Sequence, residues 1–250
     1  MAQGLANVTA AILAGGLGTR LRPVLADRPK VLAPVRGRPW ITFLLDQLAE
    51  AGWREAVLLA GHRTEQVRAV LGSCHGGLHL RYAAEPEPLG TAGALRHALP
   101  LLHSSQVLLL NGDSYAEVDL TAFLAFHRRR PTAGSLVLAH VADAARFGRV
   151  AADADGRILN FTEKQAAGPS WINAGVYLLD RHLLATIPVG RPVSLEREMF
   201  PRWLVGAGLS GFRGAGRFLD IGTPESYAAA EEFFRTAGQP DLDTHSPPTV

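Results

Sequence analysis

Three glycines follow a short apolar run near the start of this 250-residue chain. Gly15, Gly16 and Gly18 allow a tight turn whose backbone N–H groups can face an anion with no side chain in the way. The preceding run, Val8 to Leu13, is typical of a buried strand, and open α/β sheets bind ligands at the carboxyl ends of their strands. The spacing matches neither a Walker A loop nor the dinucleotide G-x-G-x-x-G pattern. The turn therefore predicts a phosphate site of another kind.

Two basic side chains follow this turn, Arg20 and Lys30. A nucleoside triphosphate carries several negative charges, and a departing pyrophosphate needs cations where its charge accumulates. Beside a phosphate turn, these two cations indicate a polyphosphate ligand. The alternative is that both are solvated surface charges.

Two aspartates stand where apolar strands are expected to end. Asp113 follows the most hydrophobic run, Val107 to Leu110, in the sequence Asn-Gly-Asp. Asp220 precedes Ile-Gly-Thr-Pro, where a strand gives way to a helix, and its alternative role is that of a helix N-terminal residue near Pro224. Two carboxylates with phosphate oxygens and waters would complete an octahedral Mg²⁺ site. We expect Mg²⁺ as the cofactor.

The runs GGLGTRLRP and RPKVLAPVRGRPWI resemble the sugar-1-phosphate nucleotidyltransferase (nucleotide-sugar pyrophosphorylase) family, and the likeness extends to about Tyr227. The resemblance implies a nucleoside triphosphate and a sugar 1-phosphate as substrates. It implies Arg20, Lys30 and Asp113 as catalytic residues and Asp113 and Asp220 as metal ligands. The nucleotide-binding residues implied in the glycine turn are Leu13, Ala14, Gly15, Gly16, Gly18 and Thr19.

The sequence from Glu85 to Gly93 resembles the family's base-reading loop, which implies that Glu85, Pro88, Gly90 and Thr91 bind the nucleotide. Many uridylyl and thymidylyl members have Gln where this chain has Glu85. A Gln amide suits a pyrimidine edge, whereas a carboxylate only accepts hydrogen bonds and suits the adjacent N1–H and N2–H₂ donors of guanine. We therefore expect GTP. The alternative is that Glu85 points to solvent and base choice lies elsewhere.

The resemblance also implies a sugar-phosphate pocket. Its members are Gly112, Glu163, Lys164, Asn173 and Gly175. Lys164 would neutralise the attacking phosphate, Glu163 and Asn173 would bind sugar hydroxyls, and Gly175 would permit close approach of the ring. Either Glu196 or Glu198 is also expected to approach the sugar.

Strand-like and helical runs alternate through the first half of the chain, which predicts an α/β fold. We expect a Rossmann-like three-layer sandwich with a mostly parallel mixed sheet, in one domain of residues 1–237. Its nucleotide-binding half covers about 1–130 and its sugar-binding half about 131–237; residues 238–250 are polar and Pro-rich and predict a disordered tail. The predicted strands are Val8 to Leu13, Ala56 to Ala60, Leu78 to Ala83, Val107 to Leu110, Ser135 to His140, Arg149 to Ala152, Ile158 to Thr162 and Ala174 to Leu179. The predicted helices are Ile41 to Ala51, Thr64 to Leu71 with Thr64 as N-cap, Thr91 to Leu99, Leu120 to Arg130, Leu195 to Val205 and Pro224 to Arg235.

The composition excludes several classes of protein. A formal net charge of +2 does not predict a nucleic-acid partner, and the single cysteine, Cys74, excludes an internal disulfide. No apolar run approaches the roughly 20 residues that span a bilayer, and the N-terminus lacks the pattern of a secretory signal. We expect a cytoplasmic protein with no membrane partner, and a homo-oligomer stays open as an alternative to a monomer.

The sequence disfavours three other functions. A Rossmann dehydrogenase lacks the required glycine spacing, and a serine hydrolase lacks a G-x-S-x-G elbow. A non-catalytic sugar-nucleotide sensor is disfavoured, because Arg20, Lys30, Asp113, Lys164 and Asp220 are all present. The likeness to short guanylyltransferases of the family favours D-glycero-D-manno-heptose 1-phosphate as the sugar substrate, with mannose 1-phosphate as the second choice. Transfer of a uridylyl, thymidylyl or adenylyl unit stays as an alternative to guanylyl transfer.

Overall fold

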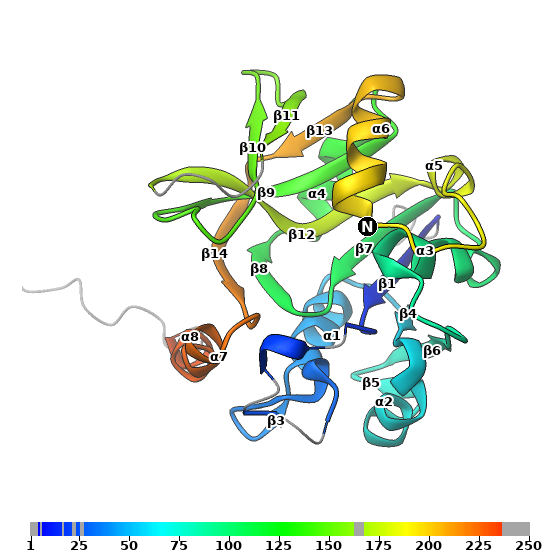
Figure 1. Cartoon of the computed structure of the whole chain (residues 1–250), viewed down its shortest axis with the longest axis vertical. Coiled ribbons are helices and arrows are strands. Elements are labelled where there is room, and N and C mark those ends of the chain that lie inside the picture. Colours follow the sequence, from blue (N-terminus) through cyan, green and yellow to red (C-terminus); the bar gives the residue numbers. More distant parts are fainter. Residues whose placement is uncertain are drawn as a thin grey trace, which may run out of the picture.

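A mixed sheet of ten strands runs through the middle of the computed structural model (Figure 1). The structure describes residues 5, 7–16, 18–21, 24–25, 28–162 and 168–236. The strand order is β11-β10-β12-β7-β1-β4-β6-β5, and β9 pairs with both β12 and β13. The strands are β1 (Val8–Leu13), β4 (Glu55–Leu59), β5 (Cys74–His75), β6 (Leu78–Ala83), β7 (Gln106–Asn111), β9 (Gly134–Val141), β10 (Arg149–Ala152), β11 (Ile158–Thr162), β12 (Ser170–Asp180) and β13 (Leu209–Phe212).

The parallel strands β7, β1, β4 and β6 form the nucleotide half of the sheet. Strands of a parallel sheet are buried on both faces and therefore read as nearly continuous apolar runs. In β1, Ala10 and Ile12 belong to one core cluster while Ala11 belongs to the other. Strand β12 then pairs antiparallel with β7 and joins the second half of the chain to the same sheet. The predicted mixed α/β sheet is confirmed.

Helices cover the two faces of the sheet and give the three expected layers. Helices α1, α2 and α4 pack on the face of Ala10 and Ile12, whereas α3, α5 and α6 pack on the face of Ala11. A π-helical turn at Leu195–Met199 leads into α6. The helices of these layers are α1 (Ile41–Glu50), α2 (Thr64–Leu71), α3 (Gly90–His97), α4 (Leu120–Arg128), α5 (Arg181–Ala185) and α6 (Phe200–Gly206).

A smaller unit at one end of the sheet joins the C-terminus to the early chain. Strand β14 (Ala215–Asp220) pairs antiparallel with β8 (Ser114–Val118), and β2 (Pro34–Val35) pairs with β3 (Arg38–Pro39). Helices α7 (Pro224–Ala228) and α8 (Ala230–Thr236) follow β14 (Figure 1). The Phe234 ring of α8 stacks on Phe43 at a centroid distance of 3.8 Å and meets the buried Trp40 edge-on at 5.8 Å. These rings hold the C-terminal helices beside α1.

Some local predictions were wrong. Thr64 is the first residue of α2 and not its N-cap; its hydroxyl donates to the Gly61 carbonyl at 2.6 Å. Helix α4 ends at Arg128, and strands β8 and β13 were not predicted. Because strand pairing crosses residue 131, the two proposed halves share one sheet. Residues 238–250, the predicted tail, lie outside the described residues. Over those that are described, the helices are too short and too polar for any of them to cross a bilayer.

Candidate active site

A cleft of about 570 Å³ opens where the nucleotide half, the sugar half and strand β14 meet. Its walls carry both positive and negative side chains around a floor that includes Phe161, Phe200 and Phe218. Of the predicted site residues, Arg20, Asp113, Asn173, Gly175, Glu196 and Asp220 line this cleft. The structure therefore brings together side chains that come from both ends of the sequence.

Strand pairing places the two candidate metal ligands side by side. Asp220 on β14 is opposite Ser114 on β8, and the backbone N–H of Ile221 donates to the Asp113 carbonyl at 2.9 Å. Residues opposite each other in an antiparallel pair have Cα atoms about 4.5–5.5 Å apart. Asp113 and Asp220 consequently stand at adjoining positions of one two-stranded ribbon, facing one cleft.

Each aspartate is paired with a basic side chain. The Lys30 ammonium lies 2.8 Å from Asp113 Oδ2, and Arg146 Nη2 lies 2.9 Å from Asp220 Oδ1. The Lys30 side chain is only 9% exposed, whereas that of Asp113 is 45% exposed. The charge of the nearly buried Lys30 ammonium is thus neutralised by a carboxylate that also faces the cleft. Two carboxylates are the oxygen donors that Mg²⁺ prefers to take from protein, so the donor set fits that ion. The described residues contain no group of three or more His, Cys, Asp or Glu side chains that could hold a metal alone.

Gly112 joins the Asp113 segment to the first strand. Its N–H donates to the Leu13 carbonyl at 2.9 Å, and a Cβ at this position would lie 2.3 Å from that same oxygen. The buried indole of Trp40 donates to the Gly112 carbonyl at 2.9 Å. Glycine is required here by backbone packing; the predicted contact of Gly112 with a sugar phosphate stays a prediction.

The glycine turn packs against a second glycine segment that the sequence did not single out. The Ala14 N–H donates to the Leu59 carbonyl at 2.8 Å, and a Cβ on Gly15 would lie 3.1 Å from the Gly61 nitrogen. Gly18 has a φ of +58°, and a Cβ there would lie 3.2 Å from the Cβ of Lys30. Nothing lies within 4 Å of a Cβ built on Gly16. Gly15 and Gly18 are therefore required by packing, and Gly16 is exposed. The predicted contacts of these glycines with a nucleotide stay predictions, and the side chain of Thr19 lies outside the described part.

Glu85 lies inside the protein and does not point to solvent. It is 8% exposed, and its Oε2 accepts a hydrogen bond from the Leu89 N–H at 3.1 Å. Its Oε1 lies 3.7 Å from a Cβ built on Gly61, which itself packs on Gly15. Glu85 thus stands beside the glycine turn, in a position to accept from a base held there. A carboxylate accepts hydrogen bonds and donates none, so a ligand group that meets Glu85 should bring N–H groups.

The glycines after Glu85 face another part of the protein. Gly90 has a φ of +71°, and a Cβ on it would lie 2.6 Å from the Val193 carbonyl oxygen, which accepts from the Ala92 N–H at 2.9 Å. The Thr91 hydroxyl accepts from the Leu195 N–H at 2.8 Å, and Pro88 is exposed. A side chain at Gly90 would therefore clash with the Val193 carbonyl, but the backbone of Gly90 is exposed, and its predicted contact with a base stays a prediction.

On the sugar side, Asn173 is held by its neighbours. Its Oδ1 accepts from the Gly175 N–H at 3.0 Å, and its Nδ2 donates to the Tyr177 hydroxyl at 2.9 Å. Burial raises the pKa of Tyr177 well above its ordinary value, and the nearby Glu196 raises it further, so the hydroxyl stays protonated. Gly175 has a φ of +77°, and a Cβ on it would lie 2.6 Å from Ser114 Oγ. Glu163 and Lys164 lie outside the described residues.

The structure separates the two glutamates that the sequence left open. Glu196 lines the cleft, whereas Glu198 accepts from the Ser194 N–H at 3.0 Å and pairs with Arg191 at 2.8 Å. That backbone hydrogen bond from Ser194, together with Arg191, lowers the pKa of Glu198. Glu196 is therefore the glutamate that can approach a sugar.

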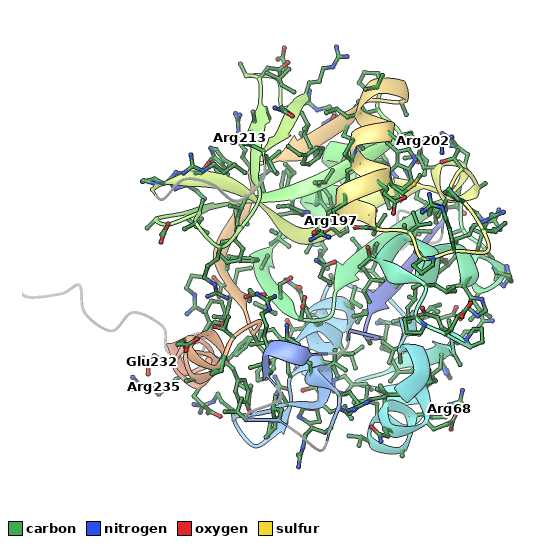
Figure 2. The ribbon with its side chains drawn as sticks, in the orientation of Figure 1. Arg68, Arg197, Arg202, Arg213, Glu232 and Arg235 are labelled. Carbon is green, nitrogen blue, oxygen red and sulfur yellow. The ribbon has the colours of Figure 1, made fainter. Side chains whose placement is uncertain are left out.

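Sequence reasoning missed several cations of the cleft. Arg146 comes from the segment between β9 and β10, Arg149 is the first residue of β10, and Arg197 comes from the π-helical turn. Figure 2 shows Arg197 just before α6 and Arg202 within that helix. The signal that could have found Arg146 and Arg149 is the pair of arginines around Phe147-Gly148, two residues that also line the cleft.

Comparisons with known proteins agree with this geometry. The family described as "Nucleotidyl transferase" matches residues 9–237. A mannose-1-phosphate guanylyltransferase of Mycobacterium tuberculosis is 37% identical over 225 residues, which cover 88% of this chain and 63% of that protein. A D-glycero-alpha-D-manno-heptose 1-phosphate guanylyltransferase of Aneurinibacillus thermoaerophilus is 30% identical over 223 residues, which cover 89% of this chain and 96% of that protein.

Among solved structures, HddC from Yersinia pseudotuberculosis complexed with GMP-PN has a TM-score of 0.81 and 29% sequence identity, covering 90% of this chain and 99% of HddC. The chain spans less than two thirds of the length of the mycobacterial relative, but nearly the whole of the heptose relative and of HddC. Family match, fold and cleft agree, and the chain belongs to the nucleotidyl transferase family.

Proposed function

We propose that this chain transfers a guanylyl unit from GTP to a sugar 1-phosphate and releases pyrophosphate. One observation carries the proposal: Asp113 and Asp220 adjoin across the β8–β14 pairing and share a cleft with Arg20, while Lys30 packs beside Gly18 and pairs with Asp113 at 2.8 Å. Paired carboxylates and cations around one cleft suit a polyphosphate with a divalent ion.

The reaction needs no general base, because the attacking oxygen of a sugar 1-phosphate is already anionic. That oxygen would attack the α-phosphorus, and the bond to the bridging oxygen of pyrophosphate would break. Mg²⁺ held by Asp113 and Asp220 would neutralise phosphate oxygens when bound. Arg20 would stabilise the transferring and leaving phosphates, Lys30 would assist, and Lys164 would neutralise the acceptor phosphate. Catalysis then consists of positioning and charge neutralisation.

Different observations support the choice of base and the choice of sugar. Glu85 is buried beside the glycine turn, where a carboxylate can accept from two adjacent N–H donors. The heptose relative matches this chain over 96% of its own length, which supports D-glycero-D-manno-heptose 1-phosphate as the acceptor. The second candidate is mannose 1-phosphate, favoured by the 37% identity of the mycobacterial relative.

A matrix of substrates tests the proposal. ATP, CTP, GTP, UTP and dTTP are each combined with Mg²⁺ and a panel of sugar 1-phosphates, and pyrophosphate formation is measured. We expect turnover with GTP and a manno-configured sugar, and none with the Asp113→Asn variant. A preference for UTP or dTTP would refute guanylyl transfer, and nucleotide-sugar binding with no pyrophosphate in any well would indicate a non-catalytic sensor.

A further inference from the structure

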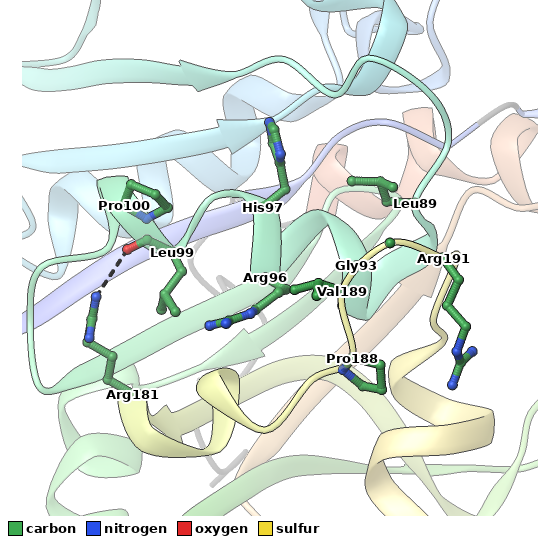
Figure 3. A pocket seen from close by; sticks show the side chains of 11 residues that line it. Leu89, Gly93, Arg96, His97, Leu99, Pro100, Arg181, Pro188, Val189 and Arg191 are labelled. Carbon is green, nitrogen blue, oxygen red and sulfur yellow. Dashed lines mark hydrogen bonds between the residues drawn. The ribbon is translucent and has the colours of Figure 1, made fainter.

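A second pocket of about 420 Å³ lies between α3 and the segment 188–191, beside Leu89 (Figure 3). None of the described residues that line it is acidic, and three are arginines: Arg96, Arg181 and Arg191. Its volume falls in the range of about 300–1,000 Å³ typical of small-molecule sites. Neither the predicted nucleotide site nor the predicted sugar site uses these arginines.

The Arg181 guanidinium is fixed in place. Its Nε donates to the Leu102 carbonyl at 2.7 Å and its Nη2 to the Leu99 carbonyl at 3.4 Å. An arginine has five N–H donors in a rigid fork, so these two bonds leave three for a ligand. Figure 3 shows Arg96 on the same side of the pocket as Arg181. Among the described residues, Arg96 has no hydrogen-bond or ion-pair partner.

Arg191 lies at the opposite rim of the pocket in Figure 3. It is paired with Glu198 at 2.8 Å, but both side chains are substantially exposed, 52% and 38%, so the pair is weak and readily exchanged for a stronger anion. Between the two cationic ends lie Leu89, Pro188 and Val189 (Figure 3). The pocket therefore has positive charge at both ends and apolar side chains between them.

We propose that this pocket binds a small organic bisphosphate, with one phosphate at Arg96 and Arg181 and the other at Arg191. Planar guanidinium groups match phosphate oxygens in bidentate geometry, and a short carbon skeleton would cover the apolar middle. Inorganic phosphate would occupy one end and leave the middle of the pocket empty.

The pocket shares its wall with the base loop. Leu89 lines the pocket, its N–H donates to Glu85 Oε2 at 3.1 Å, and its carbonyl accepts from the Val193 N–H at 2.8 Å. A ligand that ties α3 to the segment 188–193 fixes Leu89, and with it the carboxylate proposed to read the base. Binding should therefore lower the KM for the nucleoside triphosphate, and coupling between sites typically reaches fivefold or more.

The test uses 2,3-bisphosphoglycerate as the probe, because it is not a sugar 1-phosphate. Calorimetry should show binding to the wild type and a loss of affinity of about tenfold or more in Arg96→Gln, as expected when a charge-assisted hydrogen bond is removed. Arg202→Gln, an exposed arginine of α6, is the matched control and should bind as the wild type does. Equal affinity in Arg96→Gln, or loss of binding only in Arg20→Gln, would overturn the site.

The kinetic arm rests on the proposed function, whereas the binding arm does not. With the probe present, the KM for the nucleotide should fall at least fivefold in the wild type and stay unchanged in Arg96→Gln. Without the probe, both proteins should have the same KM. Binding without any change in KM would refute the coupling, and absence of turnover in the unliganded wild type would count against the proposed function alone.

Discussion

Glu85→Gln is the sharpest test of base recognition. The substitution keeps the shape of the side chain and an oxygen that can still accept from the Leu89 N–H, which lies 3.1 Å from Oε2. Folding should therefore be preserved. The change replaces one acceptor oxygen by an NH₂ donor in a side chain that is 8% exposed, where a donor facing guanine N1–H or N2–H₂ has no partner.

The magnitude follows from the loss of a charge-assisted hydrogen bond, about 1.5–3 kcal/mol. Since each 1.4 kcal/mol is a factor of ten, kcat/KM for GTP should fall about ten- to a hundredfold. The value for UTP or dTTP should fall less than twofold or rise, because Gln offers an acceptor and a donor together. Initial rates of pyrophosphate release at subsaturating nucleotide measure both.

The matched control is Glu87→Gln, which makes the same change of charge on an exposed side chain two residues further along the loop. It should leave the ratio of GTP to UTP rates within twofold of the wild type. If Glu85→Gln and Glu87→Gln lower the GTP rate equally, loop charge explains the effect and the proposed contact with the base is refuted. Equal GTP rates in Glu85→Gln and the wild type would refute it as well.

Three further changes follow from the packing. In Gly222→Ala the new Cβ would lie 2.8 and 2.9 Å from the two Asp220 carboxylate oxygens and would displace that carboxylate. The Mg²⁺ concentration for half-maximal rate should therefore rise about tenfold, while the thermal midpoint stays unchanged. An unaltered Mg²⁺ titration would exclude Asp220 as a ligand. Gly112→Ala places a Cβ 2.3 Å from the Leu13 carbonyl oxygen and should lower the free energy of unfolding by at least about 2 kcal/mol, which corresponds to roughly 4–8 °C in Tm. Gly16→Ala is the control: nothing lies within 4 Å of its Cβ, and Tm should stay unchanged. A hydrogen bond from the Arg217 side chain lowers the pKa of Glu117, so this ionised carboxylate stabilises the fold at neutral pH and loses that effect as the pH falls through its lowered pKa. Glu117→Gln should therefore lower Tm at pH 7, and in a scan of Tm against pH its difference from the wild type should shrink as the pH falls below the ordinary pKa of a glutamate. A difference that does not change with pH would contradict the assignment.

The order of elements could be read from the sequence because it depends on local patterns. Four of the predicted strands that lie in the sheet's parallel half, such as Val8 to Leu13 and Leu78 to Ala83, were found with nearly the predicted bounds. Contacts between distant segments could not be read in that way. The approach of the Val193 carbonyl to Gly90 and the packing of Gly15 on Gly61 depend on which loops meet in space. A glycine in the sequence does not say whether a ligand or a backbone will lie against it.

The same limit explains why the cations of the cleft were only half predicted. Lys30 and Asp113 are 83 positions apart, and Arg146 and Asp220 are 74 apart, yet each pair forms an ion pair, and both aspartates line one cleft. Each pairing neutralises a carboxylate that would otherwise repel its neighbour across the β8–β14 ribbon. If Asp113 and Asp220 held a divalent ion, Lys30 and Arg146 would no longer be needed to neutralise them and could bind phosphate oxygens. The two basic residues would then pair with the aspartates before the substrate arrives and bind its phosphates afterwards, which gives Arg146 a function in this cleft.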